Sequence, residues 1–258
     1  MRAAPVISCR DEGFLSRVRH GVQMRMSCKG YSGSASGFRN QDAAADVSGL
    51  SLNHAKRRCC AKETICVEGD EVEAIFQVID GTVKIYKMSI DGKRQVVRFL
   101  KAGDWLADIA CDEHRHTAEA IGDVTLRLWP KSELTALMRR DAAKAMMMFE
   151  VASQSLAAAE EQLLVLGRKS ASEKVATFLL SLAKPSLDGA LEAALVIDIP
   201  MQRTDIADYL GLSVETVCRK ITEFARCGVI TAQTATHLQV NNIDALRRIA
   251  STEGALVH

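Results

Sequence analysis

Residues 203–226 read RTDIADYLGLSVETVCRKITEFAR, and this stretch decides the fold. Apolar residues recur at helical spacing on both sides of Gly211, which stands where a helix C-terminus favours the left-handed conformation that glycine adopts most easily. We therefore predict one helix that is capped by Thr204 and ends at Leu210, and a second helix that is capped by Ser213. Two short helices joined by a tight turn are the form of a helix-turn-helix.

The second predicted helix has one apolar and one polar face. Its polar face carries Glu215, Cys218 and Arg219 near the N-terminus, the end that enters the DNA major groove. Such a helix is often an ordinary core helix, but small Ala207 in the first helix and the short turn favour a DNA reader. The apolar stripe, which we expect to be buried, consists of Val214, Val217, Ile221 and Phe224.

The three polar residues suit base recognition. Arg219 can donate two hydrogen bonds to a guanine, and Glu215 can accept one from a cytosine. The same two residues can also pair with each other at i, i+4, and an ordinary surface ion pair is the alternative role. For Cys218 two compatible roles stay open: contact with a thymine methyl group, or oxidation of an exposed thiol, which would set negative charge against the DNA.

Net charge says little about partners. The chain carries a formal charge of +1, and residues 168–258 hold ten basic and ten acidic residues. Phosphate contacts must therefore come from the local placement of side chains rather than from a broadly basic surface. The candidates around the reading helix are Arg203, Thr204, Ser213, Thr216, Lys220 and Arg226.

The segments before the helix-turn-helix differ in pattern. Residues 1–48 hold a basic, Gly/Ser-containing stretch with little periodicity, which predicts a mobile arm. Residues 49–140 alternate short apolar runs with Gly-Asp and Asp-Gly pairs, including Asp80-Gly81. Strands at this spacing, separated by turns, predict an antiparallel β-roll with an interior that can hold a ligand.

Residues 141–167 follow a heptad pattern. Apolar residues alternate in steps of four and three without a break, which is the seam of a coiled coil and favours a homodimer through this helix. Packing of the helix against its own domain is the alternative. We expect Gly167 to end the helix and to act as a hinge. The seam residues are Ala145, Phe149, Ala152, Leu156, Ala159, Leu163 and Leu166.

Residues 168–258 contain the elements of a winged helix around the helix-turn-helix. Residues 172–184 read as an amphipathic helix that opens on a serine cap, and residues 228–242 read as a two-stranded wing followed by a terminal helix. The whole chain is thus expected to be α+β: an N-terminal antiparallel β-roll, a long dimerisation helix and a C-terminal winged helix-turn-helix.

This combination resembles the CRP/FNR family of transcription regulators. IADYLGLSVETVCRKITEF is similar to the family's C-terminal signature, and EGDEVEAIFQVIDGTVKIYKMSIDGKRQVVRFLKAGDWL is similar to FixK-type sensor domains. Cysteine at position 218, in place of the usual serine, resembles the FixK branch. The resemblance covers roughly residues 50 to 250. It implies a cyclic-nucleotide-binding-like roll, a homodimer on a TTGA-N6-TCAA palindrome in double-stranded DNA, RNA polymerase as a partner, and low-oxygen gene control.

The resemblance also raises the question of an effector. Residues 103–120 lack the Gly-Glu and Arg-Ser pairs of cyclic-nucleotide sensors in the expected places, so we expect no cyclic nucleotide. An iron–sulfur cluster needs four suitably spaced thiolates, whereas Cys59 and Cys60 are adjacent and point to opposite faces of a strand. We expect no obligatory cofactor; a regulator switched by an unrecognised ligand, a haem or a cluster is the alternative.

The alternative from another class is a metal-dependent, cupin-like enzyme built on His114, His116 and Glu119. The spacing to the glutamate is too short and a fourth ligand is missing, so we interpret the histidines as solvated residues of a turn, with haem ligation by one of them left open. The eight cysteines of this long chain favour reduced thiols in the cytoplasm. No apolar run approaches the ~18 residues of a membrane span.

Overall fold

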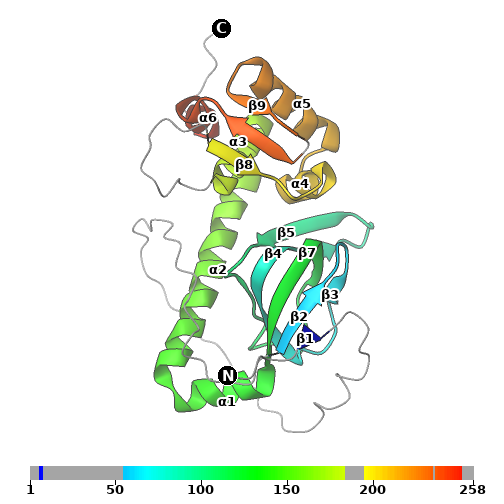
Figure 1. Cartoon of the computed structure of the whole chain (residues 1–258), viewed down its shortest axis with the longest axis vertical. Helices are drawn as coiled ribbons and strands as arrows, with labels where there is room; N and C mark the ends of the chain where they lie inside the picture. The colour runs from blue at the N-terminus through cyan, green and yellow to red at the C-terminus, as the bar shows by residue number, and fades with distance from the viewer. Residues whose placement is uncertain (1–5, 8–54, 184–194, 235, 252–258) are drawn as a thin grey trace.

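The computed structural model describes residues 6–7, 55–183, 195–234 and 236–251. Almost all of the predicted arm, residues 1–48, lies outside these ranges. The described residues form a β-roll, a long helix beside it, and a winged helix at the far end of that helix (Figure 1). This is the predicted α+β architecture.

The roll is a seven-stranded sheet whose strand order is β1-β2-β7-β4-β5, with β3 paired to β7 and β6 to β4. All pairs are antiparallel except β1 with β2. Alternating side chains from β4, β5 and β7 fill its interior. The strands are β1 (Val6–Ile7), β2 (Ala55–Cys59), β3 (Thr64–Cys66), β4 (Ala74–Met88), β5 (Arg94–Leu100), β6 (Trp105–Leu106) and β7 (Thr117–Pro130).

The predicted turn at Asp80-Gly81 is wrong, because strand β4 continues through it. The pairing of β4 with β7 shifts register on both sides of Asp80, so the dipeptide forms a bulge. Gly81 has φ +88°, and a Cβ atom there would collide with the carbonyl oxygen of Asp123. The glycine is therefore required by a close approach of two strands rather than by a reversal of the chain.

Two helices follow the roll. Helix α1 (Lys131–Arg140), which was not predicted, leads into α2 (Ala142–Arg168), and Asp141 caps α2 by accepting from the backbone N–H groups of residues 143 and 144. The prediction that Gly167 ends the long helix is wrong: α2 continues to Arg168, and Lys169 then adopts an extended backbone. The next helix begins there because Ser170 forms a capping box with Glu173.

The winged helix contains α3 (Ala171–Leu182), β8 (Leu195–Asp198), α4 (Arg203–Leu210), α5 (Val214–Arg226), β9 (Ile230–Ala232), β10 (His237–Val240) and α6 (Ile243–Ala250). The wing has three strands instead of the predicted two, because β8 pairs with β10. The first helix is capped by Gln202 rather than Thr204. It ends at Leu210 as predicted, and Gly211 adopts the left-handed conformation with φ +61°.

The winged helix does not hang free of the roll. Figure 1 shows α4 lying over β5, the edge strand of the sheet. Phe99 and Ile121 of the roll pack against the winged-helix core. Phe99 contacts Tyr209 of α4 and Phe178 of α3, with ring centroids 5.1 and 6.2 Å apart. None of the helices in the described part of the chain has the length and apolar character needed to cross a membrane.

Candidate nucleic-acid interface

Helix α5 presents the three predicted base-reading residues to solvent. Glu215, Cys218 and Arg219 are exposed, whereas the opposite face is buried through Val217 and Phe224 in the winged-helix core. Ile221 is buried with them, and Val214 is half-buried. The helix therefore divides as the 3.6-residue period predicts, with one face for the core and one face open.

The N-terminus of α5 is fixed by its cap. The Ser213 side chain accepts a hydrogen bond from the Thr216 backbone N–H at 3.2 Å, which confirms the predicted cap. Hydrogen bonds from its own backbone N–H and from Ser213 hold the pKa of the Glu215 carboxyl below its usual range. Glu215 and Arg219 do not form an ion pair in the described structure. The carboxylate of Glu215 and the guanidinium of Arg219 are therefore both exposed and not paired with each other.

The predicted phosphate-contacting residues surround this face and differ in exposure and in their bonding partners. Thr204 and Arg226 are exposed at two ends of the motif, and Arg203 is half-buried. Lys220 Nζ lies 2.8 Å from Glu223 Oε2, so its charge is partly neutralised within α5. Thr216 and Ser213 are joined to each other by their hydroxyl groups at 3.0 Å.

The described cysteines differ in exposure. Cys218, Cys60 and Cys227 are exposed, while Cys59 is buried. Burial raises the pKa of the Cys66 thiol to about 12, which keeps it protonated and unreactive. Only Cys218 among them lies on the polar face of α5.

Helix α2 leaves most of the predicted seam uncovered. Phe149, Leu156 and Leu163 are 65, 61 and 69 % exposed, whereas Met148 and Val151 on another face pack against the chain's own β-roll and α1. An apolar groove of about 550 Å³ also opens beside the seam, lined by Ile109, Met138, Ala142, Ala145, Met146, Met148, Phe149 and Ala152. Leu166 is half-buried, and a methyl group added at Gly211 would lie 3.6 Å from its Cδ2.

The interpretation of His114 and His116 as solvated residues is wrong. His114 is 6 % exposed and stacks on Phe76, and His116 is half-buried. Arg115 Nε donates to Asp108 Oδ1 at 2.8 Å. Burial acts to raise the pKa of Asp108, but the His114 ring 3.6 Å away and the hydrogen-bonded Arg115 guanidinium outweigh it and lower the pKa to about 2. Glu119 points elsewhere, to Lys84, and no three metal-ligating side chains converge within the described ranges.

A β-roll joined by a long helix to a winged helix with an open reading face defines a DNA-binding transcription regulator. The model of the cyclic nucleotide-binding domain matches residues 56–141, and that of the Crp-like helix-turn-helix domain matches residues 173–249. The nitrogen fixation regulation protein FixK of Bradyrhizobium diazoefficiens is 38 % identical over 170 residues, 65 % of this chain and 70 % of the relative. FixK of Rhizobium meliloti is 33 % identical over 187 residues, 72 % of this chain and 83 % of the relative.

A solved structure gives the same result. FixK2 from Bradyrhizobium japonicum aligns with a TM-score of 0.71 and 33 % identity, covering 79 % of this chain and all of that one. The chain therefore belongs to the CRP/FNR family of transcription regulators and is FixK-like. The cupin-like alternative is wrong, because the homologues are transcription regulators and not enzymes.

Sequence reasoning missed a cluster of charges between the roll and α4. The charge cluster, as we name it, consists of Lys84, Arg94, Glu119, Asp205 and Asp208. Its one sequence signal is a lysine inside the buried run VKIY of β4, which calls for a buried partner. The partner itself is hidden from sequence inspection because it lies 121 residues downstream.

Proposed function

We propose that the protein is a homodimeric transcription activator that reads a TTGA-N6-TCAA-type palindrome through Glu215, Cys218 and Arg219. The observation that carries the proposal is the exposure of these three side chains on one face of α5, next to a capped N-terminus. Arg219 would read guanine and Glu215 cytosine. Arg203, Thr204, Ser213, Thr216, Lys220 and Arg226 would contact phosphates around them.

Dimerisation would run along α2. The exposed seam residues Phe149, Leu156 and Leu163 form an apolar stripe of the kind that a monomer rarely leaves open, and the small residues Ala152 and Ala159 between them permit a close helix approach. A second copy of α2 would cover both the stripe and the adjoining groove. It would set two α5 helices about one DNA turn apart, the spacing of two half-sites.

The physiological role rests on the relatives. FixK proteins are named for the regulation of nitrogen fixation, and a further relative from Rhodopseudomonas palustris, 34 % identical, is named a transcriptional activatory protein. We infer a role in low-oxygen gene control through contact with RNA polymerase, in the cytoplasm and with no obligatory cofactor. The chain would divide into an arm (1–48), a sensor-like roll (49–140), a dimer helix (141–167) and a DNA reader (168–258).

Cys218 would make this function sensitive to oxidation. Its thiol is exposed and lies between the two charged readers, so a sulfinic or sulfonic acid there would face DNA phosphates and base acceptors. Repulsion between these negative groups would weaken binding.

Fluorescence anisotropy with three labelled duplexes tests the proposed operator. The first carries TTGA-N6-TCAA, the second has the same half-sites with the spacer shortened to N3, and the third has scrambled half-sites. We expect tight binding to the first alone, because the N3 spacer rotates one half-site away from its reader. Equal affinity for all three duplexes would contradict the proposed recognition.

A further inference from the structure

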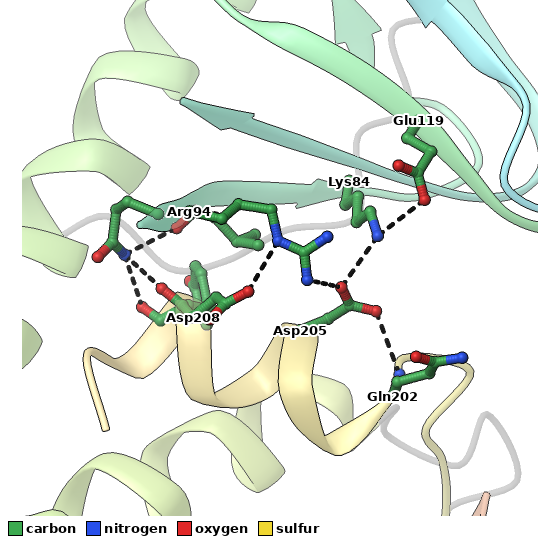
Figure 2. Close-up of polar contacts among 9 residues, drawn as sticks. Lys84, Arg94, Glu119, Gln202, Asp205 and Asp208 are labelled. Atoms are coloured by element: carbon green, nitrogen blue, oxygen red, sulfur yellow. Dashed lines mark hydrogen bonds and ion pairs between the residues drawn. The ribbon is translucent and has the colours of Figure 1, made fainter. Parts of the chain in front are cut away.

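Helix α4 is tied to the β-roll by ion pairs that cross from one folding unit to the other. Lys84 Nζ on β4 lies 3.0 Å from Asp205 Oδ1, and Arg94 Nη2 on β5 lies 2.9 Å from the same oxygen. Arg94 Nε also donates to Asp208 Oδ2, one turn further along α4, at 2.8 Å. Figure 2 shows the two cations of the sheet side by side above the two carboxylates of the helix.

The centre of this cluster is closed to water. Asp205 is 4 % exposed and Lys84 is 5 % exposed, and Glu119 on β7 completes the group at 2.8 Å from Lys84 Nζ. The other carboxylate oxygen of Asp205 accepts from the Gln202 backbone N–H at 3.4 Å, at the start of α4. Every charge in the cluster therefore has an opposite charge within hydrogen-bond distance, which a buried ion requires.

The C-terminal end of α4 is held separately. Gln95 of β5 donates to the carbonyl oxygen of Asp208 at 2.6 Å, and Gln162 of α2 donates to that of Tyr209 at 2.9 Å. The Tyr209 ring packs between Phe99 and Phe178. The carbonyl groups in the last turn of a helix have no hydrogen-bond donor within the helix. Here side chains of the roll and of α2 act as the donors.

The orientation of the reading helix follows from that of α4. Ile206, Ala207 and Leu210 of α4 share one buried core with Val217 and Ile221 of α5. Ion pairs and hydrogen bonds are directional, whereas the apolar contacts of Phe99 tolerate sliding, so the charge cluster selects one angle between roll and reader. In that arrangement α5 lies away from the roll with its reading face open (Figure 1).

We propose that Asp205 is a positioning residue for DNA binding: through Lys84 and Arg94 it holds the winged helix on the β-roll in the orientation that reads the operator. This rests on the proposed function, since it assumes that α5 is the reader. Without the cluster the winged helix samples other angles. The apparent affinity for DNA then falls in proportion to the share of time spent in the reading orientation.

Two substitutions test this with opposite changes of charge. Asp205→Asn keeps an oxygen for the Gln202 N–H but turns an amide toward Lys84 and Arg94, so α4 stays capped while the cross-contacts break. Removing a negative charge near DNA strengthens binding on electrostatic grounds alone. A fall in affinity of about tenfold for TTGA-N6-TCAA, which we expect, therefore reports lost orientation.

Arg94→Gln removes a cation on the roll side and leaves the sequence of the winged helix unchanged. It therefore tests the same contacts even if the Asp205→Asn winged helix does not fold. Its matched control is Lys93→Gln, which removes the same charge one residue away. Lys93 is 85 % exposed, and among the described residues its ion pair is with Asp91 of its own hairpin. We expect Arg94→Gln to weaken binding severalfold and Lys93→Gln to leave it within about twofold of the parent.

Hydrogen–deuterium exchange of the full chain without DNA gives a readout independent of the operator. We expect faster exchange in β5 in Asp205→Asn and Arg94→Gln, because α4 no longer covers that edge, with parental rates in α5 and α6 showing that the winged helix stays folded. Parental exchange in β5 in both variants, or parental or tighter DNA affinity in both, overturns the positioning role. If the parent fails to bind the palindrome, the proposed operator is wrong, and the exchange data still decide whether Asp205 holds α4 on the β-roll.

Discussion

Helices α4 and α5 are neighbours in one motif, yet their charged residues differ in what they contact. Asp205 and Asp208 of α4 are engaged by Lys84 and Arg94 of the roll, within the same chain. Glu215 and Arg219 of α5 stand open to solvent. The charge pattern along the two helices does not show which helix has its charges engaged and which has them exposed. That difference depends on what packs against each helix. In this helix-turn-helix one helix is held by the roll, and the other leaves its polar face open.

The largest effect is expected from substitutions that disrupt the proposed dimer, because they would separate the two α5 helices. Leu156→Glu with Leu163→Glu would place four like charges in the α2 interface, and we expect dimerisation to weaken by at least about 3 kcal/mol, roughly 100-fold. Analytical ultracentrifugation measures this. Gln154→Glu with Ala157→Glu, both at exposed positions off the seam, is the matched control and should leave the dimer intact. If the two double variants dimerise equally well, the seam is not the dimer interface.

Arg219→Ala tests whether the exposed face of α5 contacts bases. We expect a loss of about 1 to 3 kcal/mol in binding and relaxed preference at one guanine, because the bidentate contact is lost. Competition binding with single-base operator variants measures it. Arg226→Ala, by comparison, should weaken all sequences alike and reduce the dependence of log affinity on log salt by about 1. If Arg219→Ala behaves as Arg226→Ala does, Arg219 is a phosphate contact and not a base reader.

Between the two helices, Gly211 should be sensitive to substitution. It has φ +61°, so Gly211→Ala should destabilise the protein by about 1 to 2 kcal/mol. Gly167→Ala is the matched control: Gly167 is an exposed helical residue with no neighbour within 4 Å of an added Cβ, so the same change should stabilise by roughly 0.5 to 1 kcal/mol. Urea unfolding followed by circular dichroism measures both. Shifts of the same sign would contradict the backbone assignments.

The smallest effect in reducing buffer is expected at Cys218. Cys218→Ser should bind DNA about as well as the parent, and it should keep binding after a peroxide treatment that disables the parent, because a hydroxyl cannot follow the thiol oxidation series. Cys60→Ser and Cys227→Ser, which remove other exposed thiols, should remain as sensitive as the parent. Equal loss of binding in Cys218→Ser and the parent would move the redox response to another thiol or to oxidative unfolding.

Local rules were enough for most of the fold. The stop at Leu210, the Ser213 cap and the burial of Val217, Ile221 and Phe224 follow from neighbours within a few residues, and sequence inspection predicts them correctly; Val214, also expected in the stripe, is half-buried. The errors at Asp80-Gly81 and Gly167 share one cause: glycine permits a turn or a helix end, but a paired strand or a continuing helix uses the same residue. Strand β8 was missed because its partner β10 lies beyond the whole helix-turn-helix.

The candidate site divides in the same way. The exposure of the candidate base-reading residues on α5 can be predicted from the sequence, because one helix period defines both faces. The charge cluster is not visible, because Lys84 and Arg94 meet Asp205 only after more than a hundred residues of chain have folded back. Burial of His114 was also missed, since its contact with Phe76 depends on the closure of the roll.

The pairing of Lys84 with both Glu119 and Asp205 has a consequence for the order of events during synthesis. Asp205 follows Lys84 by 121 residues, which a ribosome adds in about 6 to 24 s. Glu119 is made much earlier and lies on β7, the direct neighbour of β4. The nascent roll can therefore close with Lys84 already neutralised, and α4 later docks onto a finished surface instead of waiting for an uncompensated buried amine to find its counterion.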